Sequence, residues 1–423
     1  MNIPSLYAFF RQSTGVTTDT RNIQKGNLFF ALKGDNFNGN TFAAAALQNG
    51  AAYSIVDEAA GDDERIIRVE NVLATLQQLA LHHRRQLSGK VIALTGSNGK
   101  TTTKELIAAV LSGTFKTQAT KGNLNNHIGI PLTLLSMPVD VDFAVVEMGA
   151  NHQLEIDSYC HYTEPDFGLI TNVGLAHLEG FGGFEGVVKG KTELYRFLVN
   201  KEAKIFVNAD NDLLMNKATE AGFDANRWIS YGTKTAFCSG KLLEGSFLNF
   251  EMEGQAVHTN LVGAYNFENV LAACCIGKYF GVPFEKVKAA VESYVPSNNR
   301  SQQIEQDSNT IILDCYNANP SSMKAALENF ASIKHEKKIA ILGGMKEMGS
   351  ASADVHRDIA ALALSLPLHQ LVFIGNEFDF AKDKANWFAD TQKAKDWFAA
   401  NLPTDSLILV KGSRANKLEE LFV

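Results

Sequence analysis

The stretch 92-IALTGSNGKTTTKEL-106 decides how the middle of this chain folds. An apolar run leads into Gly96 and Gly99, and Lys100 and Thr101 follow at the start of a helical pattern. A strand, a glycine turn, Lys-Thr and a helix form the context of a phosphate-binding loop. In that context the backbone N–H groups and the helix N-terminus face an anion. The usual pattern has a further glycine five positions before Gly99, where this chain has Leu94, so the loop is a short form.

This loop predicts a nucleotide site. The lysine would reach the β- and γ-phosphates of the nucleotide, and the threonine hydroxyl would ligate Mg²⁺. The alternative is a tight turn that carries a surface lysine. The residues predicted to bind ATP through the loop are Gly96, Ser97, Asn98, Gly99, Lys100, Thr101 and Thr102.

Two further polar side chains follow predicted strands. Glu147 ends the apolar run Phe143–Glu147, and His177 comes shortly after the run 168–172. The carboxyl ends of parallel strands gather at one edge of a sheet, which would place both side chains beside the loop. Mg²⁺ needs oxygen ligands, so Glu147 is a candidate ligand. An ordinary acid at a strand end and a packing histidine are the alternatives.

Composition limits the class of protein. The 423 residues are 45% hydrophobic and 20% charged, as in a soluble globular protein. No apolar run reaches the roughly 18 residues that span a bilayer, and the N-terminus does not resemble an export signal. The net charge of -7 argues against a nucleic-acid partner but leaves room for an anionic small substrate in a basic pocket. The five cysteines show no metal-ligand spacing. We therefore expect a cytoplasmic protein.

The order of the predicted elements indicates an α/β protein of three domains. A small mixed α/β domain covers residues 1–88, and strands alternating with helices over 89–296 predict a mostly parallel sheet around the P-loop. The polar stretch 294–300 is the predicted boundary before a smaller, doubly wound, Rossmann-like domain at 297–423. Its last predicted element is a helix over 414–422.

Several motifs together resemble the Mur ligases of peptidoglycan synthesis. The resemblance covers essentially the whole chain, and the short glycine loop is the usual form in that family. It implies a UDP-binding first domain, a central ATPase domain and a Rossmann-like third domain. The motifs are TGSNGKTT at 95–102, EMGANH at 147–152, NVGLAHLEGFG at 172–182, GAYNFEN at 263–269, DCYNANP at 314–320 and KGSR at 411–414.

Within the family the chain resembles the MurF type. That type is a cytoplasmic ATP-dependent ligase that joins D-alanyl-D-alanine to UDP-MurNAc-tripeptide through an acyl phosphate. A MurE-like ligase that adds a single amino acid, or a folylpolyglutamate synthase, is the alternative reading. A nucleotide-binding regulatory protein with a decayed site is an alternative of another class. The presence of Lys100, Thr101, Glu147, His177 and Lys191 argues against decay.

The resemblance also implies a second Mg²⁺. Lys191 matches the family's N-carboxylated lysine, whose carbamate supplies oxygen ligands, and His177 would help to hold that ion. Taken alone, the sequence favours an exposed helix lysine at 191, with Lys189 as a rival on another helix face. Lys100, Lys191 and His177 are thus the expected catalytic residues, and Thr101, Glu147, His177 and Lys191 the expected metal ligands.

The remaining expected roles also come from the resemblance. Asn266 and Asn269, three residues apart on one helix face, match the family's adenine-side contacts. Arg300 and Asp314 match its contacts to the γ-phosphate side and the ribose. One departure is visible, because relatives usually carry Asp-Gly-His where this chain has 38-NGN-40, which removes a histidine contact. The expected substrate-binding residues are Thr18, Asp19, Arg21, Asn123, Asn317 and Asn319. The expected working form is a monomer.

Overall fold

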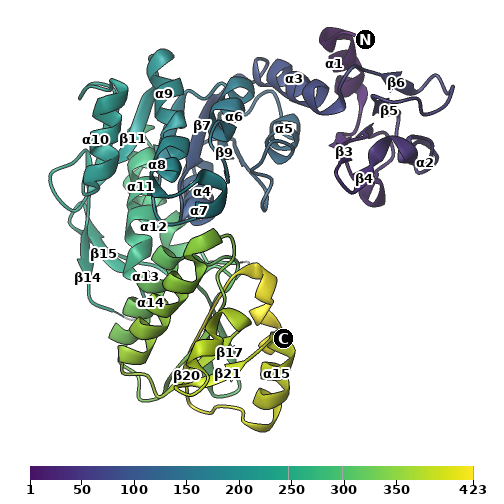
Figure 1. The fold of residues 1–423 in the computed structure, drawn as a ribbon. Helices are drawn as coiled ribbons and strands as arrows, with labels where there is room; N and C mark the ends of the chain where they lie inside the picture. The colour runs from purple at the N-terminus through teal and green to yellow at the C-terminus, as the bar shows by residue number, and fades with distance from the viewer. Residues whose placement is uncertain (246, 298, 423) are drawn as a thin grey trace.

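The computed structural model describes residues 1–245, 247–297 and 299–422. It is an α/β protein, as the sequence predicts, and its three main sheets have four, seven and six strands. The N-terminal part lies to one side of the central part, and the C-terminal part lies below it (Figure 1). The predicted boundary at 294–300 includes Asn298, which is outside the described residues. Among the described residues no helix is long and apolar enough to cross a membrane.

The N-terminal part holds a parallel sheet of order β1-β2-β5-β6. Helix α3 leads from it into the central sheet, and its first turn is capped by Asn71, whose side-chain oxygen accepts a hydrogen bond from the Ala74 N–H at 2.7 Å. The elements are α1 Ile3–Gln12, β1 Val16–Thr17, η1 Thr20–Asn22, β2 Leu28–Phe30, β3 Lys33–Gly34, β4 Phe37–Asn38, η2 Gly39–Phe42, α2 Ala43–Gln48, β5 Tyr53–Val56, β6 Ile66–Arg68 and α3 Val72–Arg84.

The central part is a parallel sheet of order β13-β12-β11-β10-β7-β9-β8 with helices on both faces. Strand β7, in the interior of this sheet between β10 and β9, is buried after its first residue, which explains why that sequence reads as an unbroken apolar run. The two faces of the sheet pack into separate hydrophobic cores, and one of these cores continues into α1 and α3 of the N-terminal part.

The sequence did not reveal the edge of this region, a small antiparallel sheet β14-β15-β16. The elements are β7 Lys90–Thr95, α4 Lys100–Ser112, β8 Thr117–Ala119, α5 Gly129–Leu135, β9 Phe143–Glu147, α6 Glu155–Thr163, β10 Phe167–Ile170, α7 Leu178–Phe181, α8 Phe184–Lys191, α9 Glu193–Asn200, β11 Lys204–Asn208, α10 Asp212–Ala221, β12 Trp228–Gly232, β13 Cys238–Ser239, β14 Lys241–Leu243, β15 Asn249–Met252, β16 Gln255–His258, η3 Ala264–Asn266, α11 Phe267–Tyr279 and α12 Phe284–Ser293.

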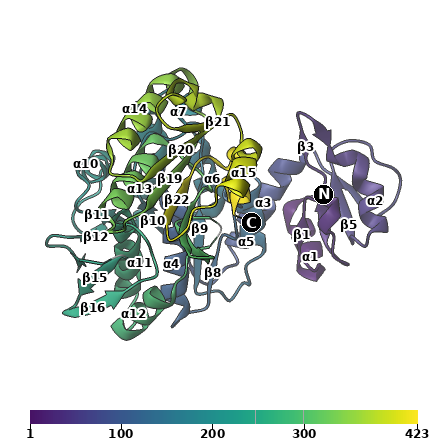
Figure 2. The same cartoon turned by 90° about the horizontal axis from the view of Figure 1, so that it is seen from below.

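The C-terminal part has a sheet of order β17-β18-β22-β19-β20-β21, parallel except for β17. Figure 2 shows this sheet from below, with α13 and α14 beside it. The elements are β17 Gln302–Gln306, β18 Asn309–Asp314, α13 Pro320–Ser332, β19 Lys338–Gly343, η4 Gly349–Ala351, α14 Ser352–Ser365, β20 Gln370–Ile374, η5 Asn376–Ala381, β21 Asn386–Phe388, α15 Thr391–Ala400, β22 Leu407–Lys411, η6 Arg414–Asn416 and η7 Leu418–Leu421.

The predicted helix over 414–422 is wrong. Two short 3₁₀ turns, η6 and η7, stand there instead, separated by Lys417 in the left-handed conformation at φ 51°. Leu418 and Leu421 are both buried, and their spacing of three residues matches the period of a 3₁₀ turn. Packing against the sheet therefore sets the local structure here.

Candidate active site

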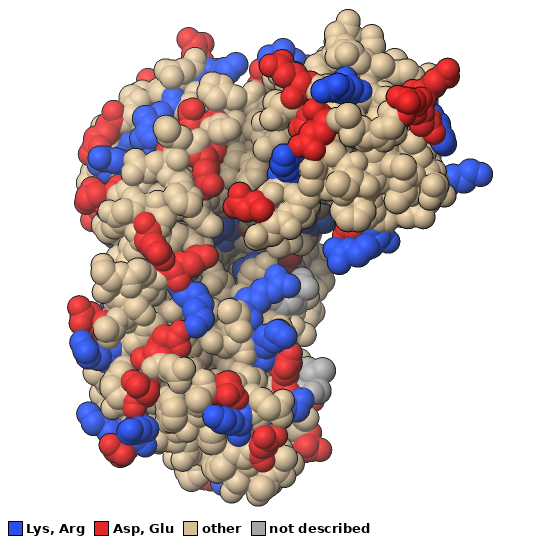
Figure 3. Space-filling view, turned by 45° about the vertical axis from the view of Figure 1, so that its right-hand side comes forward, with Lys and Arg blue, Asp and Glu red and all other residues tan. Residues whose placement is uncertain are grey.

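A cavity of about 690 Å³ lies between the carboxyl ends of the central strands and the C-terminal part. We call it the P-loop cavity. Figure 3 shows the hollow between the two parts, with Lys and Arg side chains around it. The predicted site residues that line it are Ser97, Asn98, Gly99, Lys100, Thr101, Thr102, Asn123, Glu147, His177, Asn266, Asn269, Arg300, Asp314, Asn317 and Asn319.

The glycine loop is closely packed from behind. Gly99 has φ 76° and caps α4, and a Cβ at this position would collide with the side-chain amide of Asn269. Gly96 has φ 148°, and a Cβ there would collide with the Thr171 hydroxyl. Neither position therefore accepts a larger residue, and the first turn of α4 remains open to the cavity.

Lys100 folds back over this loop. Its Nζ donates hydrogen bonds to the carbonyl oxygens of Gly96 at 2.8 Å and Ser97 at 3.2 Å. Burial lowers the pKa of Lys100, while the nearby charge of Glu147 acts in the opposite direction. The ammonium group has no carboxylate bound to it within the described residues, which leaves its charge available to an anion in the cavity.

Glu147 is almost fully buried, at 1% exposed. Its Oε1 accepts hydrogen bonds from the Thr101 hydroxyl at 3.2 Å and from Asn125 Nδ2 at 2.8 Å. Its Oε2 is buried without a hydrogen-bond partner, and Lys104 Nζ lies 4.0 Å away. A buried carboxylate oxygen without a hydrogen bond is costly unless another ligand binds it.

This arrangement fits Mg²⁺. No group of three or more His, Cys, Asp or Glu side chains that could hold a metal exists in the described ranges. An ion here would take the Thr101 hydroxyl, the Glu147 carboxylate, phosphate oxygens and water. That all-oxygen set, with few protein ligands, is typical of Mg²⁺ bound together with a nucleotide.

The sequence taken alone favoured an exposed helix lysine at position 191, and this expectation is wrong because Lys191 is buried. It is 1% exposed, whereas Lys189 on the same helix is exposed to solvent. Its Nζ donates to the Ala150 carbonyl oxygen at 3.0 Å and lies 5.0 Å from the ring centroid of Phe181. Burial lowers the pKa of Lys191 well below its usual value, and the charge of Lys100 lowers it further. Of the predicted site residues in the central part, Lys191 and Gly96 are not among those that line the P-loop cavity.

His177 lies on the rim of the cavity, in the left-handed conformation at φ 53°. Its Nδ1 pairs with the carboxylate of Glu347, which belongs to the C-terminal part. No local pattern predicts this partner, because 170 residues separate the two positions. Any metal bound through Nδ1 would have to displace or share that carboxylate.

The C-terminal part touches the loop directly. Asn319 caps α13 by accepting the Ser322 N–H at 2.9 Å, and its Nδ2 donates to Asn98 Oδ1 at 2.7 Å. Asp314 accepts a hydrogen bond from Lys411 Nζ at 2.6 Å. The structure thus brings Asn319 against the loop and places Asp314 on the opposite wall.

The spacing of Asn266 and Asn269 predicted that they share one helix face, and in the structure their side chains are close enough to form a hydrogen bond with each other. Asn269 Nδ2 donates to Asn266 Oδ1 at 3.0 Å, and Asn269 Oδ1 accepts from the Thr103 hydroxyl at 3.0 Å. Both side chains are buried, so they brace α11 against the helix of the loop. Whether they also contact a nucleotide base stays a prediction.

The predicted residues Thr18, Asp19 and Arg21 lie in the N-terminal part and do not line the P-loop cavity. Arg21 forms a fork-like pair with Asp19, with nitrogen–oxygen distances of 2.9 and 2.8 Å. Asn40 stands where relatives usually carry histidine, and it has a structural role. Its side chain forms hydrogen bonds with the side chains of Asn38 and Asp57 and with the Asp57 N–H.

The sequence analysis missed several residues at or near the cavity. Asn125 lines the cavity and donates a hydrogen bond to Glu147, and Lys104, which is buried on α4, lies 4.0 Å from the same carboxylate. A lysine one turn before the apolar residues Ile107 and Leu111 of the predicted helix was the available signal. Glu347 and Tyr316 line the cavity too, but only the meeting of two parts of the chain places them there.

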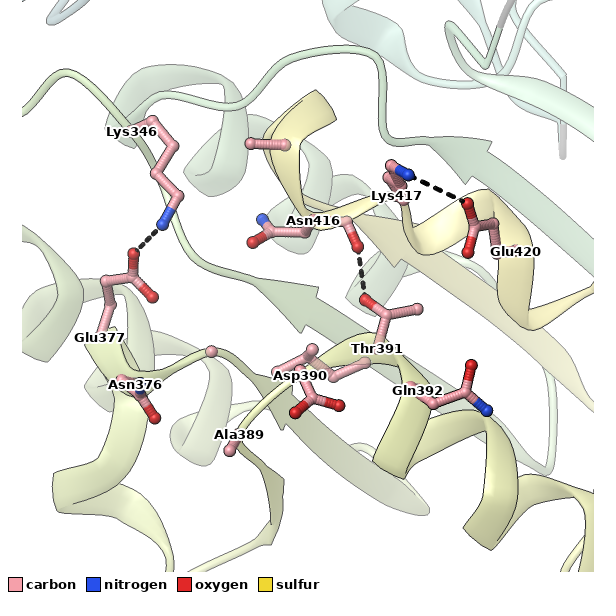
Figure 4. A pocket seen from close by; sticks show the side chains of 13 residues that line it. Lys346, Asn376, Glu377, Ala389, Asp390, Thr391, Gln392, Asn416, Lys417 and Glu420 are labelled. Atoms are coloured by element: carbon pink, nitrogen blue, oxygen red, sulfur yellow. Dashed lines mark hydrogen bonds and ion pairs between the residues drawn. The ribbon is translucent and has the colours of Figure 1, made fainter.

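A second cavity, of about 680 Å³, lies within the C-terminal part, and we call it the C-terminal cavity. Figure 4 shows its cationic side chains directed at carboxylates: Lys346 pairs with Glu377, and Lys417 lies 3.7 Å from Glu420. Its remaining wall includes the Thr391 hydroxyl, which donates to the Asn416 carbonyl oxygen.

The fold and the P-loop cavity define a three-part α/β protein with a nucleotide-type phosphate loop at a junction between parts. Family models match the chain in three stretches: 12–84 (Mur ligase family, catalytic domain), 94–277 (Mur ligase middle domain) and 299–414 (Mur ligase, glutamate ligase domain). The chain belongs to the Mur ligase family.

Named relatives agree with this assignment. The chain is 33% identical to the UDP-N-acetylmuramoyl-tripeptide–D-alanyl-D-alanine ligase of Bacillus subtilis (strain 168), over 96% of this chain and 92% of the relative. A crystal structure of MurF from Acinetobacter baumannii matches with a TM-score of 0.88 at 30% identity, covering 99% and 97% of the two chains. The structure of MurF from Thermotoga maritima in complex with ADP matches with a TM-score of 0.85 at 26% identity, covering 97% and 96%.

Proposed function

We propose that this protein is an ATP-dependent, ADP-forming ligase that joins D-alanyl-D-alanine to UDP-MurNAc-tripeptide. The reaction would be the last cytoplasmic step in making the peptidoglycan pentapeptide precursor, and through it would serve cell shape and division. The observation that carries the proposal is the buried carboxylate oxygen of Glu147 that has no hydrogen bond, beside the Thr101 hydroxyl, in a cavity shared by two parts of the chain. The relatives named above support the choice of substrates.

The proposed division of labour follows the predicted domains. Residues 1–88 would bind the UDP part of the precursor through Thr18, Asp19 and Arg21. Residues 89–296 would bind ATP, and 297–423 would complete the site. Asn123, Asn317 and Asn319 are the proposed contacts to the peptide substrates. A monomer is the proposed working form.

The chemistry proceeds in two steps. The terminal carboxylate of the tripeptide attacks the γ-phosphorus of ATP, which gives an acyl phosphate and releases ADP. The amine of D-alanyl-D-alanine then attacks the acyl carbon, and phosphate leaves with the bonding electrons of the C–O bond. Lys100 would exchange its two carbonyl partners for phosphate oxygens and neutralise their charge.

Bound Mg²⁺ would screen the negative charge of the phosphates, with Thr101 and Glu147 holding the first ion. For the second ion we propose His177 and the carbamate of Lys191. The lowered pKa of Lys191 supports this assignment, because the neutral amine is the form that reacts with carbon dioxide. Arg300 and Asp314 are the proposed contacts to the γ-phosphate side and the ribose, and Asn266 and Asn269 those to adenine.

The test is release of phosphate from ATP in the presence of UDP-MurNAc-tripeptide and a panel of amine acceptors. We expect release to depend on both the tripeptide precursor and D-alanyl-D-alanine. The panel includes free L-lysine, diaminopimelate and glutamate. Stimulation by one of these in place of the dipeptide would replace the proposal with a MurE-like or folylpolyglutamate synthase activity.

A further inference from the structure

Two side chains of the P-loop cavity have no role in the reaction described above. Tyr316 and Arg414 both line it, together with Arg300. The guanidinium carbon of Arg300 lies 3.7 Å from the centroid of the Tyr316 ring, and that of Arg414 lies 5.2 Å from it. Nη1 of Arg414 is also 3.5 Å from the Tyr316 hydroxyl oxygen. One aromatic ring thus contacts two cations, and we call these three residues the Tyr316 unit.

Sheet register produces this arrangement. Strands β18 and β22 are parallel neighbours, with Asp314 opposite Lys411. Tyr316 lies two residues after Asp314 and Arg414 three residues after Lys411, so both leave the same edge of the sheet. The Tyr316 N–H donates to the Asn299 carbonyl oxygen at 3.2 Å, which brings the neighbouring Arg300 alongside the ring.

The charges of the unit are not neutralised by acids. Within the described residues, neither Arg300 nor Arg414 forms an ion pair with a carboxylate, whereas Lys411 on the same wall is paired with Asp314 at 2.6 Å. Two guanidinium groups repel each other, and long side chains resist being held in one rotamer. Contact with the aromatic ring offsets part of that cost and keeps both groups at the wall.

The chemistry of the unit selects its ligand. Planar guanidinium groups bind phosphate oxygens in pairs of hydrogen bonds, and two such groups suit an anion with several oxygens. Across the cavity, the P-loop and Lys100 present donors from the other side. The charge of Arg300 also acts on Lys100, so the two cations lie within electrostatic reach of each other.

We propose that the Tyr316 unit binds the terminal phosphate of the nucleotide from the C-terminal side. Arg414 supplies a second guanidinium beside Arg300, and Tyr316 is the positioning residue for both. The inference rests on the proposed function for the identity of the nucleotide as ATP. Arg414 thereby joins Arg300 as a contact to the phosphate, and the ring of Tyr316, more than its hydroxyl, positions the two guanidinium groups.

The test compares dissociation constants for ADP and for a non-hydrolysable ATP analogue, measured by calorimetry with Mg²⁺ present. Arg414→Gln and Tyr316→Leu should each weaken the ATP analogue by about tenfold or more, which is the usual loss for a hydrogen bond to a charged group, and weaken ADP less. Tyr316→Phe keeps the ring and should stay within about twofold of the parent protein. Arg357→Gln is the matched control, because Arg357 is an exposed arginine of α14 paired with Asp354.

Three results would overturn the inference. One is an equal effect, or none, of Arg414→Gln on the two nucleotides. Another is a loss in Tyr316→Phe as large as in Tyr316→Leu. The third is a rise in the KM for the dipeptide with both nucleotide affinities unchanged. Circular dichroism identifies a variant that fails to fold. Because Arg414 is exposed, we expect Arg414→Gln to fold, so it still tests the inference if Tyr316→Leu does not fold. Nucleotide binding needs no acceptor, so a failure of the ligase proposal would be seen separately in the phosphate-release assay.

Discussion

The molecule holds two cavities of nearly equal volume, about 690 Å³ beside the P-loop and about 680 Å³ within the C-terminal part. Both lie where parallel strands end. In the C-terminal cavity Lys346 and Lys417 face carboxylates of their own wall. In the P-loop cavity Lys100 donates only to backbone carbonyls, and Glu147 keeps one oxygen without a hydrogen bond. The two cavities therefore do not differ in volume. They differ in that Lys100 has no carboxylate partner and one Glu147 oxygen has no hydrogen bond, which indicates that the P-loop cavity binds a charged ligand.

The largest expected effect comes from removing a free charge of the P-loop cavity. Lys100→Ala should lower ATP-dependent ligation by about a hundredfold to a thousandfold, because it deletes a donor aimed at the transferred phosphate. The protein should remain folded, since the hydrogen bonds of Lys100 are to its own loop. Lys334→Ala, at an exposed lysine of the C-terminal part, is the control. A rate near that of the parent protein would remove Lys100 from the mechanism.

Glu147→Gln tests the unpartnered oxygen. The amide keeps the shape of the side chain but loses the negative charge, so we expect about a hundredfold lower activity and a higher Mg²⁺ requirement for nucleotide binding. The measurement is a Mg²⁺ titration of nucleotide affinity. Glu185→Gln, at an exposed position of α8, should titrate like the parent protein. An unchanged titration in Glu147→Gln would show that this carboxylate does not hold the ion.

Lys191→Ala tests the proposed carbamate on the buried amine of Lys191. Activity should fall and recover partly when a short-chain carboxylate is added, since it could occupy the place of the carbamate. Lys189→Ala, two residues away and exposed, should be fully active. Loss without recovery would leave Lys191 as a packing residue, and no loss at all would remove it from the site.

The same lysine should make stability depend on pH. The pKa of Lys191 is lowered in the folded protein, so the unfolded chain binds this proton more readily and the free energy of unfolding falls as pH drops below 10.5. In buffer free of carbon dioxide, Lys191→Met should therefore be more stable than the parent protein at pH 7, and the difference should shrink toward pH 10. Urea unfolding at both pH values measures it. A constant difference would mean that the proton is not involved.

The smallest effect is expected from the C-terminal cavity. Lys346→Gln breaks a partly exposed ion pair with Glu377, and such pairs contribute about 0–1 kcal/mol. Nucleotide affinity should stay within about twofold, because the charge of Lys346 is already engaged. A large loss of nucleotide affinity would break the contrast between the two cavities.

Prediction from sequence worked where the signal was local. Strand β7, the glycine loop and α4 could be predicted because the apolar run, the turn glycines and the start of the helical pattern all fall within some twenty positions of one another. The bounds of β9 were predicted residue for residue for the same reason. Lys191 was different, since its burial depends on Phe181 and on Ala150, 41 residues away along the chain. The prediction of a helix over 414–422 failed because packing of Leu418 and Leu421 against the sheet overrode the helical pattern.

A P-loop, a parallel sheet around it and a carboxylate at the end of a neighbouring strand could be predicted from the sequence, because each is specified by residues close together in the chain. Which charges remain available depends on the tertiary fold. It joined His177 to Glu347, set Asn319 against Asn98 and stacked Arg300 and Arg414 on Tyr316. These contacts arise where sheet register and the meeting of two parts of the chain bring distant residues together, and no local pattern encodes that.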